Sequence, residues 1–158
     1  QRQMCIRDRY HSVYAGLCAA EGADYVLIHD GARPLVSADI IKRSMQAVKE
    51  YRACVAGMPV KDTIKIADED GYAKLTPERS KVWQIQTPQS FSYPLVYEAY
   101  RKMLADEDSA ITDDAMVVER MTNQPVKLIE GNYRNIKITT PEDLAIAEIF
   151  VEKTLKKI

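Results

Sequence analysis

The stretch from Tyr25 to Pro34 constrains the fold more than any other part of the chain. Residues 25–28, Tyr-Val-Leu-Ile, form a short apolar run, and His-Asp-Gly-Ala-Arg-Pro follows it directly. A short apolar run bounded by turn residues is typical of a strand that is buried on both faces in a parallel sheet. Ligands of open α/β sheets bind beyond the carboxyl ends of such strands. The sequence therefore predicts a binding site that includes Asp30 and Arg33.

The residues of this turn allow two interpretations. A carboxylate such as that of Asp30 is a hard oxygen ligand for Mg2+, and the guanidinium of Arg33 can bind two phosphate oxygens at once. Gly31 permits a close backbone approach or a positive φ. In the alternative interpretation, Asp30 only caps the turn and Arg33 is a solvated charge. Spacing alone leaves both interpretations open.

Hydrophobic periodicity predicts an α/β order around this strand. A helix is expected over 12–20 with Ser12 as its N-cap, a second over 37–51, and a strand over 53–58. Helices and strands that alternate with short connections are the signature of βαβ units and a parallel sheet. Further helices are expected over 93–104, over 112–121 with Thr112 as N-cap, and from Thr140 onward, and further strands over 82–86, 126–130 and 135–138.

The segment 60–80 interrupts this alternation. Residues 63–67 and 72–76 flank the dipeptide Asp70-Gly71, a combination that predicts a β-hairpin. An isolated two-stranded hairpin is only marginally stable in water, so it must pack on something. Packing on its own domain and packing on another subunit both remain open.

Composition excludes several classes of function. A length of 158 residues suggests one domain, and a net charge of -1 provides no electrostatic basis for binding nucleic acid or an anionic membrane. No apolar run approaches the length of a membrane span. The three cysteines, Cys5, Cys18 and Cys54, are too few and too scattered for a disulfide framework or a zinc site. They fit a reducing cytoplasm, bacterial or, as an open alternative, plastid.

Four motifs in a fixed order carry a resemblance to a known family. They are His-Asp-Gly-Ala-Arg-Pro at 29–34, Pro-Val-Lys-Asp-Thr-Ile-Lys at 59–65, Gln-Thr-Pro-Gln-Ser-Phe at 86–91 and Asn-Ile-Lys-Ile-Thr-Thr-Pro-Glu-Asp-Leu at 135–144. From about Ser12 to about Phe150 the chain resembles the 2-C-methyl-D-erythritol 4-phosphate cytidylyltransferases of the non-mevalonate isoprenoid pathway. Four ordered motifs are a more specific signal than any single one.

The resemblance implies a fold and a reaction. The fold would be a Rossmann-like, glycosyltransferase-A-like α/β nucleotidyltransferase with a mostly parallel sheet and a protruding hairpin arm that grips a second subunit. The reaction would join a sugar-alcohol phosphate to CTP with the help of Mg2+ and release pyrophosphate. An oxygen of the sugar phosphate would attack the α-phosphorus of CTP, so the enzyme would need to position two anions and neutralise their charge.

The same resemblance implies a role for ten residues. Asp30 would hold Mg2+, Lys137 and Thr87 would orient the attacking phosphate, and Thr63 and Arg79 would reach that phosphate from the arm of the partner subunit. Arg33 and Thr112 would bind the sugar phosphate, and the nucleotide would be contacted by Arg9, Ser12 and the backbone of Gly31. Without the resemblance, Ser12 is only a helix cap, Thr87 is a turn residue and Lys137 is a solvated strand position.

The beginning of the chain departs from the family pattern. Residues 1–8 show neither helical nor strand periodicity and contain no glycine-rich loop for a triphosphate. We therefore expect a leader over 1–8 that is not native structure, and a single cytidylyltransferase domain over 9–158 that lacks this loop. Three alternatives remain: a ribitol 5-phosphate cytidylyltransferase, which shares most of these motifs, a catalytically inert dimerising module, and a generic doubly wound domain that matches by chance.

Overall fold

A computed structural model of the chain describes residues 2–105 and 111–155. Its α-helices are α1 (Arg2–Ala19), α2 (Ala38–Tyr51), α3 (Tyr93–Ala105), α4 (Asp114–Thr122) and α5 (Pro141–Leu155), and a short 3-10 helix, η1, covers Arg79–Lys81. The strands are β1 (Tyr25–Ile28), β2 (Ala53–Pro59), β3 (Ile66–Ala67), β4 (Ala73–Leu75), β5 (Trp83–Ser92) and β6 (Lys127–Glu130). None of the helices within these ranges is long and apolar enough to cross a membrane.

Four strands form the central sheet in the order β1-β5-β2-β6. Strand β5 pairs antiparallel with both β1 and β2, whereas β2 and β6 pair parallel. Three strands therefore run in one direction and β5 runs against them, which agrees with the expected α/β class and with a common direction for most strands. Strand β1 is half-buried rather than buried on both faces, because among the described residues it has a neighbour only on its β5 side.

Strand β5 is longer than the sequence indicated. The prediction ended it at Gln86, before Thr87-Pro88, but it continues through this dipeptide to Ser92. Proline removes a backbone donor from a sheet and is tolerated where pairing is irregular. The register of β2 against β5 shifts between Val55 and Gly57, at the level of Pro88. This irregularity accommodates the proline inside a central strand.

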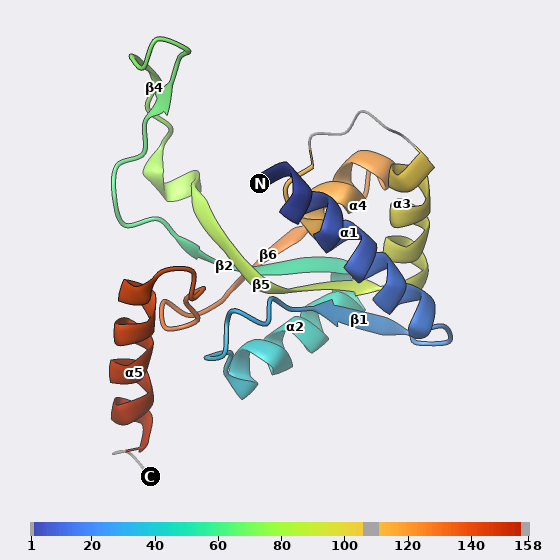
Figure 1. Cartoon of the computed structure of the whole chain (residues 1–158). Coiled ribbons are helices and arrows are strands. Elements are labelled where there is room, and N and C mark those ends of the chain that lie inside the picture. Colours follow the sequence, from blue (N-terminus) through green and yellow to red (C-terminus); the bar gives the residue numbers. More distant parts are fainter. Residues whose placement is uncertain (1, 106–110, 156–158) are drawn as a thin grey trace.

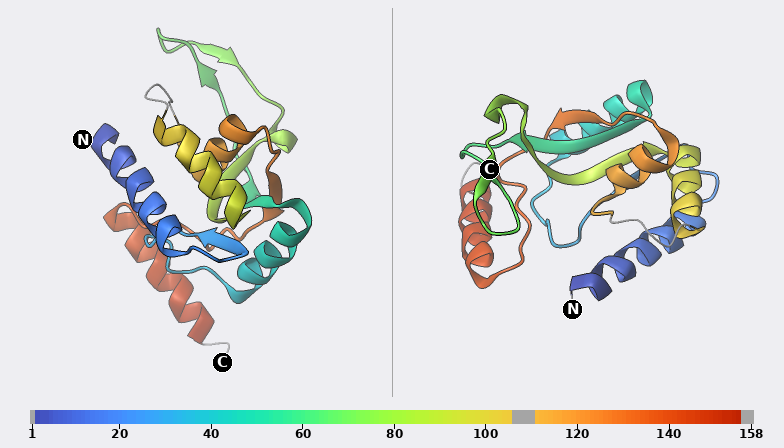
Figure 2. Two further views of the ribbon diagram at one scale, coloured as in Figure 1. Left: turned by 90° about the vertical axis from the view of Figure 1, so that its right-hand side faces the viewer. Right: turned by 90° about the horizontal axis from the view of Figure 1, so that it is seen from above.

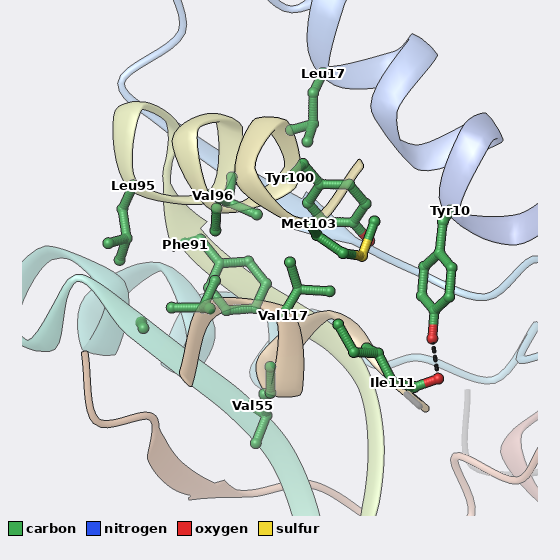
Figure 3. Close-up of a cluster of buried hydrophobic side chains, with 14 residues drawn as sticks. Tyr10, Leu17, Val55, Phe91, Leu95, Val96, Tyr100, Met103, Ile111 and Val117 are labelled. Carbon is green, nitrogen blue, oxygen red and sulfur yellow. Dashed lines mark hydrogen bonds between the residues drawn. The ribbon is translucent and has the colours of Figure 1, made fainter. Parts of the chain in front are cut away.

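Helices cover both faces of the sheet (Figure 1). Successive residues of β2 point to opposite faces: Val55 belongs to the main core, which α1, α3 and α4 share with the sheet, and Cys54 packs with Ala47 and Val48 of α2. Figure 3 shows the main core, in which Phe91 and Tyr100 are the largest fully buried side chains. The two cores fix the sheet between its helical layers.

Two elements lie outside these layers. Strands β3 and β4 form a separate two-stranded hairpin that projects away from the rest of the chain (Figure 2), and Gly71 has a positive φ of 86° in its turn. The predicted hairpin is confirmed, although its strands are shorter than expected. Helix α5 begins as predicted, because Asp143 accepts a hydrogen bond from the backbone N–H of Thr140 at 2.9 Å.

The N-terminal helix differs from the prediction. Helix α1 begins at Arg2 rather than after Ser12, so Ser12 is an exposed residue inside the helix and not its N-cap. Of the expected leader 1–8, Gln1 lies outside the described residues and the others form the first turns of this helix. Local periodicity missed these turns because the helix has no regular apolar stripe along its length. In contrast, Ser37 caps α2 as predicted, with its Oγ accepting from the N–H of Ile40.

Candidate functional site

Asp30 lies just beyond the carboxyl end of β1, where three basic side chains surround its carboxylate. Oδ2 lies 3.2 Å from Nζ of Lys137 and 3.6 Å from Nε of Arg33, and Oδ1 lies 3.9 Å from Nε of Arg9. These bases come from an early helix, from the turn after β1 and from the segment before α5. The fold therefore gathers three cations around one carboxylate that is only 17% exposed.

The pKa shifts follow from this arrangement. Burial alone would raise the pKa of Asp30, but the hydrogen bond and charge of Lys137 and the charges of Arg9 and Arg33 outweigh it, so this pKa is lowered from its ordinary value of 3.8. Burial lowers the pKa of Arg33, and Asp30 offsets this only in part. Asp30 is therefore ionised at neutral pH, and its charge is stabilised by the three basic side chains around it.

A hydrogen-bond network holds the turn that carries Asp30. The hydroxyl of Thr87 accepts from the backbone N–H of Asp30 at 3.1 Å and lies 2.9 Å from Nδ1 of His29. The other ring nitrogen, Nε2, lies 2.9 Å from the carbonyl oxygen of Arg33, which can only accept, so Nε2 is protonated and donates to it. Thr87 is thus tied to the turn as well as facing the pocket.

Lys137 reaches Asp30 from a segment that is not a strand. Residues 135–138 were predicted to form one, but they make no sheet pairing and instead join the turn after β1 through the bond from Ile138 N–H to the Ala32 carbonyl at 2.8 Å. The fully buried Asn135 anchors this segment. Its side-chain amide nitrogen donates to the backbone carbonyl of Thr87 at 2.8 Å, and its backbone carbonyl accepts from Nη1 of Arg33 at 2.9 Å. The connection holds Lys137 beside Asp30.

The start of α4 forms another wall of the site. Its N-cap is Asp113 rather than the predicted Thr112, because Oδ1 of Asp113 accepts from the N–H of Met116 at 2.9 Å. The side chain of Gln89 in β5 donates to Asp113 at 2.9 Å and accepts from the N–H of Ala115 at 2.8 Å. Thr112 is left exposed just before the helix, beside these fixed groups.

A pocket of about 360 Å³ opens between these elements. Five of the ten residues predicted from the sequence line it together: Arg9, Asp30, Thr87, Thr112 and Lys137. Arg33 stands behind Asp30 and contacts its carboxylate. The pocket therefore unites residues that are more than a hundred positions apart in the sequence.

The other four predicted residues do not line this pocket. Ser12 is exposed on α1, and Gly31 has a negative φ rather than the positive φ that was one expectation for it, although a Cβ there would meet no atom within 4 Å. Thr63 and Arg79 lie on the exposed arm, where Nη1 of Arg79 donates to the carbonyl of Lys61. The roles of these four residues remain predictions.

Sequence reasoning missed four residues of the pocket wall: Ile85, Gln86, Gln89 and Asp113. Asp113 caps α4 and also faces the pocket. Polar residues inside an apolar strand were a signal for Gln86 and Gln89, which are 6% and 2% exposed. This signal was lost because the strand was predicted to end at Gln86.

The residues fit Mg2+ only in the company of a substrate. Within 2–105 and 111–155, no three side chains of His, Cys, Asp or Glu come together as a metal site. Mg2+, however, is commonly bound by one or two carboxylates together with substrate phosphates. Asp30 supplies such a carboxylate at the edge of the pocket.

Comparison with known proteins gives consistent matches. The model of the family IspD, 2-C-methyl-D-erythritol 4-phosphate cytidylyltransferase, matches residues 6–153. Proteins of that name from Lachnospira eligens and Caldanaerobacter subterraneus subsp. tengcongensis are each 51% identical over 147 residues, which cover 92% of this chain but only 65% and 64% of those proteins. The chain thus spans just under two thirds of the length of these relatives.

Solved structures give the same result. The chain is similar to the crystal structure of 4-diphosphocytidyl-2C-methyl-D-erythritol synthase from Anaerococcus prevotii, with a TM-score of 0.86 and 39% identity over 91% of this chain and 64% of that one. It is also similar to the 2-C-methyl-D-erythritol 4-phosphate cytidylyltransferase from Thermus thermophilus, with a TM-score of 0.81 and 35% identity over 91% and 69% of the two chains.

Proposed function

Because the chain belongs to the 2-C-methyl-D-erythritol 4-phosphate cytidylyltransferase family, we propose that its pocket serves the transfer of a cytidylyl group from CTP to 2-C-methyl-D-erythritol 4-phosphate. The observation that carries the proposal is the position of Lys137, Arg33 and Arg9 around Asp30 at the edge of the pocket. Both reactants are anions, so their encounter requires cations at fixed positions.

The pocket residues would share the reaction as follows. A phosphate oxygen of the sugar phosphate attacks the α-phosphorus of CTP, and the bond to the departing pyrophosphate breaks. Lys137, 46% exposed beside the pocket, would orient the attacking phosphate, and Thr112 would contact the sugar phosphate. Mg2+ held by Asp30 and the phosphates would supply charge neutralisation. No residue is required as a covalent nucleophile.

We further propose that the hairpin acts as a dimerisation arm. Every residue from 61 to 76 is exposed, including Ile66 at 47%, Tyr72 at 74% and Leu75 at 53%. A small hairpin with apolar side chains in water is marginal alone. Contact with a second copy would cover these side chains and would bring Arg79 toward the partner's pocket.

The test uses a completed enzyme, in which the segment of the Lachnospira eligens relative that the chain does not match is joined upstream. Pyrophosphate release is measured with CTP and either 2-C-methyl-D-erythritol 4-phosphate or ribitol 5-phosphate. Faster turnover of the methylerythritol compound is expected, and preference for ribitol 5-phosphate would overturn the substrate assignment. Lys137→Ala should raise the KM for the sugar phosphate more than the KM for CTP, since the proposed partner of Lys137 is that phosphate.

The same assay addresses the inert-module alternative. We expect the 158-residue polypeptide alone to show no turnover, because it contains no glycine-rich triphosphate loop. Charge stabilisation of this kind is worth several kcal/mol in the transition state. Turnover by the 158-residue polypeptide at the rate of the completed enzyme would contradict this. Absence of turnover by both forms would favour the alternative of a catalytically inert dimerising module.

A further inference from the structure

The carboxylate of Asp114 is completely buried behind the pocket wall, and the reaction outlined above does not use it. It lies in the first turn of α4 and makes a two-point contact with Arg9: Oδ1 accepts from Nη1 at 3.1 Å and Oδ2 accepts from Nη2 at 2.6 Å. Helix capping does not explain this burial, because Asp113 is the cap. A buried carboxylate is costly unless it is paired and hydrogen-bonded, so its partners define its role.

The second partner of this carboxylate is Tyr100, which makes the third hydrogen bond. Its hydroxyl donates to Oδ1 of Asp114 from a ring that is fully buried in the main core. Figure 3 shows this ring near Tyr10, and the two make an edge-to-face contact with centroids 6.5 Å apart. Burial first, and the charge of Asp114 second, raise the pKa of Tyr100, so the hydroxyl keeps its proton and remains a donor. The core thus fixes the direction of this hydrogen bond.

Arg9 connects this buried pair to the pocket. Its side chain is 27% exposed and lines the pocket, and its Nε lies 3.9 Å from Oδ1 of Asp30, whereas Asp114 binds the two terminal nitrogens. Asp114 uses one N–H of each terminal nitrogen, and a guanidinium has a further N–H on each. The planar group is therefore held at two points, and its plane is set by groups outside the pocket.

We propose that Asp114 and Tyr100 are positioning residues that lock the guanidinium of Arg9 in the orientation it needs to bind the phosphates of the nucleotide. The proposal rests on the proposed function for the identity of the ligand. The lock itself is a property of the described structure. Tyr100 and Asp114 touch no reactant, and they act through Arg9 alone.

The lock is tested first in the 158-residue chain without any ligand. NMR measures how fast the guanidinium of Arg9 rotates about its Nε–Cζ bond. Slow rotation with separate signals for the two terminal nitrogens is expected. Asp114→Asn and Tyr100→Phe should accelerate it, and Tyr93→Phe should not. Tyr93 is the matched control, because its hydroxyl also ties α3 to another helix, by donating to the carbonyl of Leu17 in α1 at 3.0 Å, two helical turns away from Arg9.

The consequence is tested by steady-state kinetics of the completed enzyme. Asp114→Asn should raise the KM for CTP by about tenfold and Tyr100→Phe by roughly threefold, with the KM for the sugar phosphate unchanged, since charged hydrogen bonds exceed neutral ones in strength. In the background of Arg9→Met, adding Asp114→Asn should cause no further rise. A merely structural role would lower stability or the amount of active enzyme without this split between the two KM values.

Each outcome decides a separate point. Fast rotation of Arg9 in the unsubstituted chain, or slow rotation that persists in Tyr100→Phe, overturns the lock, and Tyr100→Phe retains a folded core because only one oxygen is removed. A rise in KM that is equal for both substrates, or that persists in the Arg9→Met background, overturns action through Arg9. Absence of any CTP turnover by the unsubstituted completed enzyme overturns the proposed function and leaves the rotation experiment to decide the lock.

Discussion

Replacement of Gly131 by alanine should destabilise the fold through a single side chain of the pocket wall. Gly131 is buried just after β6, where its N–H donates to the carbonyl of Gly57 at 2.8 Å. A Cβ at this position would lie 2.4 Å from Oε1 of Gln86 and 3.3 Å from the carbonyl oxygen of Gly57. The first distance is far inside van der Waals contact, so Gln86 must move.

The cost follows from the bonds that Gln86 would lose. Its amide nitrogen donates to the Asn132 carbonyl at 2.8 Å, and its Oε1 accepts from the Asn132 N–H and from the Asn135 amide, both at 3.3 Å. A typical net hydrogen bond contributes about 1 kcal/mol, and long bonds contribute less. Gln86 is 6% exposed, so water cannot replace these partners freely. We expect Gly131→Ala to lower the free energy of unfolding by about 2 kcal/mol.

Urea unfolding monitored by circular dichroism measures this value. The matched control is Gly16→Ala, because a Cβ on Gly16 would meet no atom within 4 Å and the residue lies inside α1. Alanine there should raise the free energy of unfolding by about 0.5–1 kcal/mol, since glycine is a poor helix former. If Gly131→Ala changes stability by less than about 0.5 kcal/mol, Gln86 rotates away without loss and its bonds do not hold the pocket wall.

Three further predictions follow from the same structure. Mixing Asp30→Asn and Arg79→Ala forms of the completed enzyme should restore about a quarter of full activity, because random exchange makes half the dimers mixed and each mixed dimer has one intact site. If no activity returns although the subunits have been shown to exchange, Arg79 acts in the pocket of its own subunit. The lowered pKa of Asp30 contributes stability that is present above its ordinary value of 3.8 and is lost as pH falls through the lower folded-state value. The difference in unfolding free energy between the unsubstituted chain and Asp30→Asn should therefore shrink as pH falls below this value, and a constant difference in urea titrations would contradict it. Burial raises the pKa of the Cys54 thiol to about 11, so at pH 8 a thiol reagent should modify the exposed Cys18 and leave Cys54 intact until the chain unfolds, as peptide mapping can verify. Early modification of Cys54 would show that α2 opens readily.

Much of the fold was predictable because the signals are local. Ser37 caps α2, Gly71 turns the hairpin, and the capping box of Asp143 starts α5, since each of these depends on residues within four positions of one another. The apolar strand before Asp30 was predictable for the same reason. Its expected burial on both faces was wrong, because burial depends on which strands lie beside it.

The residue types of the candidate site were predictable, but the hydrogen bonds and ion pairs between its residues were not. Motif order pointed to Asp30 and Lys137, and the structure brings them within 3.2 Å of each other. The partners of Arg9 were invisible, because Asp114 follows it by 105 positions and no local pattern links them. Gln89 escaped notice for a similar reason, since its role depends on where α4 begins against β5.

The sequence by itself determined the alternation of helices and strands, the position of the main turns and the motifs that identify the family, because these rest on propensity, periodicity and short-range hydrogen bonds. Only the tertiary structure decided that β5 continues through Pro88, that residues 135–138 join the turn after β1 instead of the sheet, and that Arg9 lies between two carboxylates. Each of these outcomes depends on contacts between distant segments. Such contacts form when packing excludes water, because a buried polar group without a hydrogen-bond partner then costs free energy.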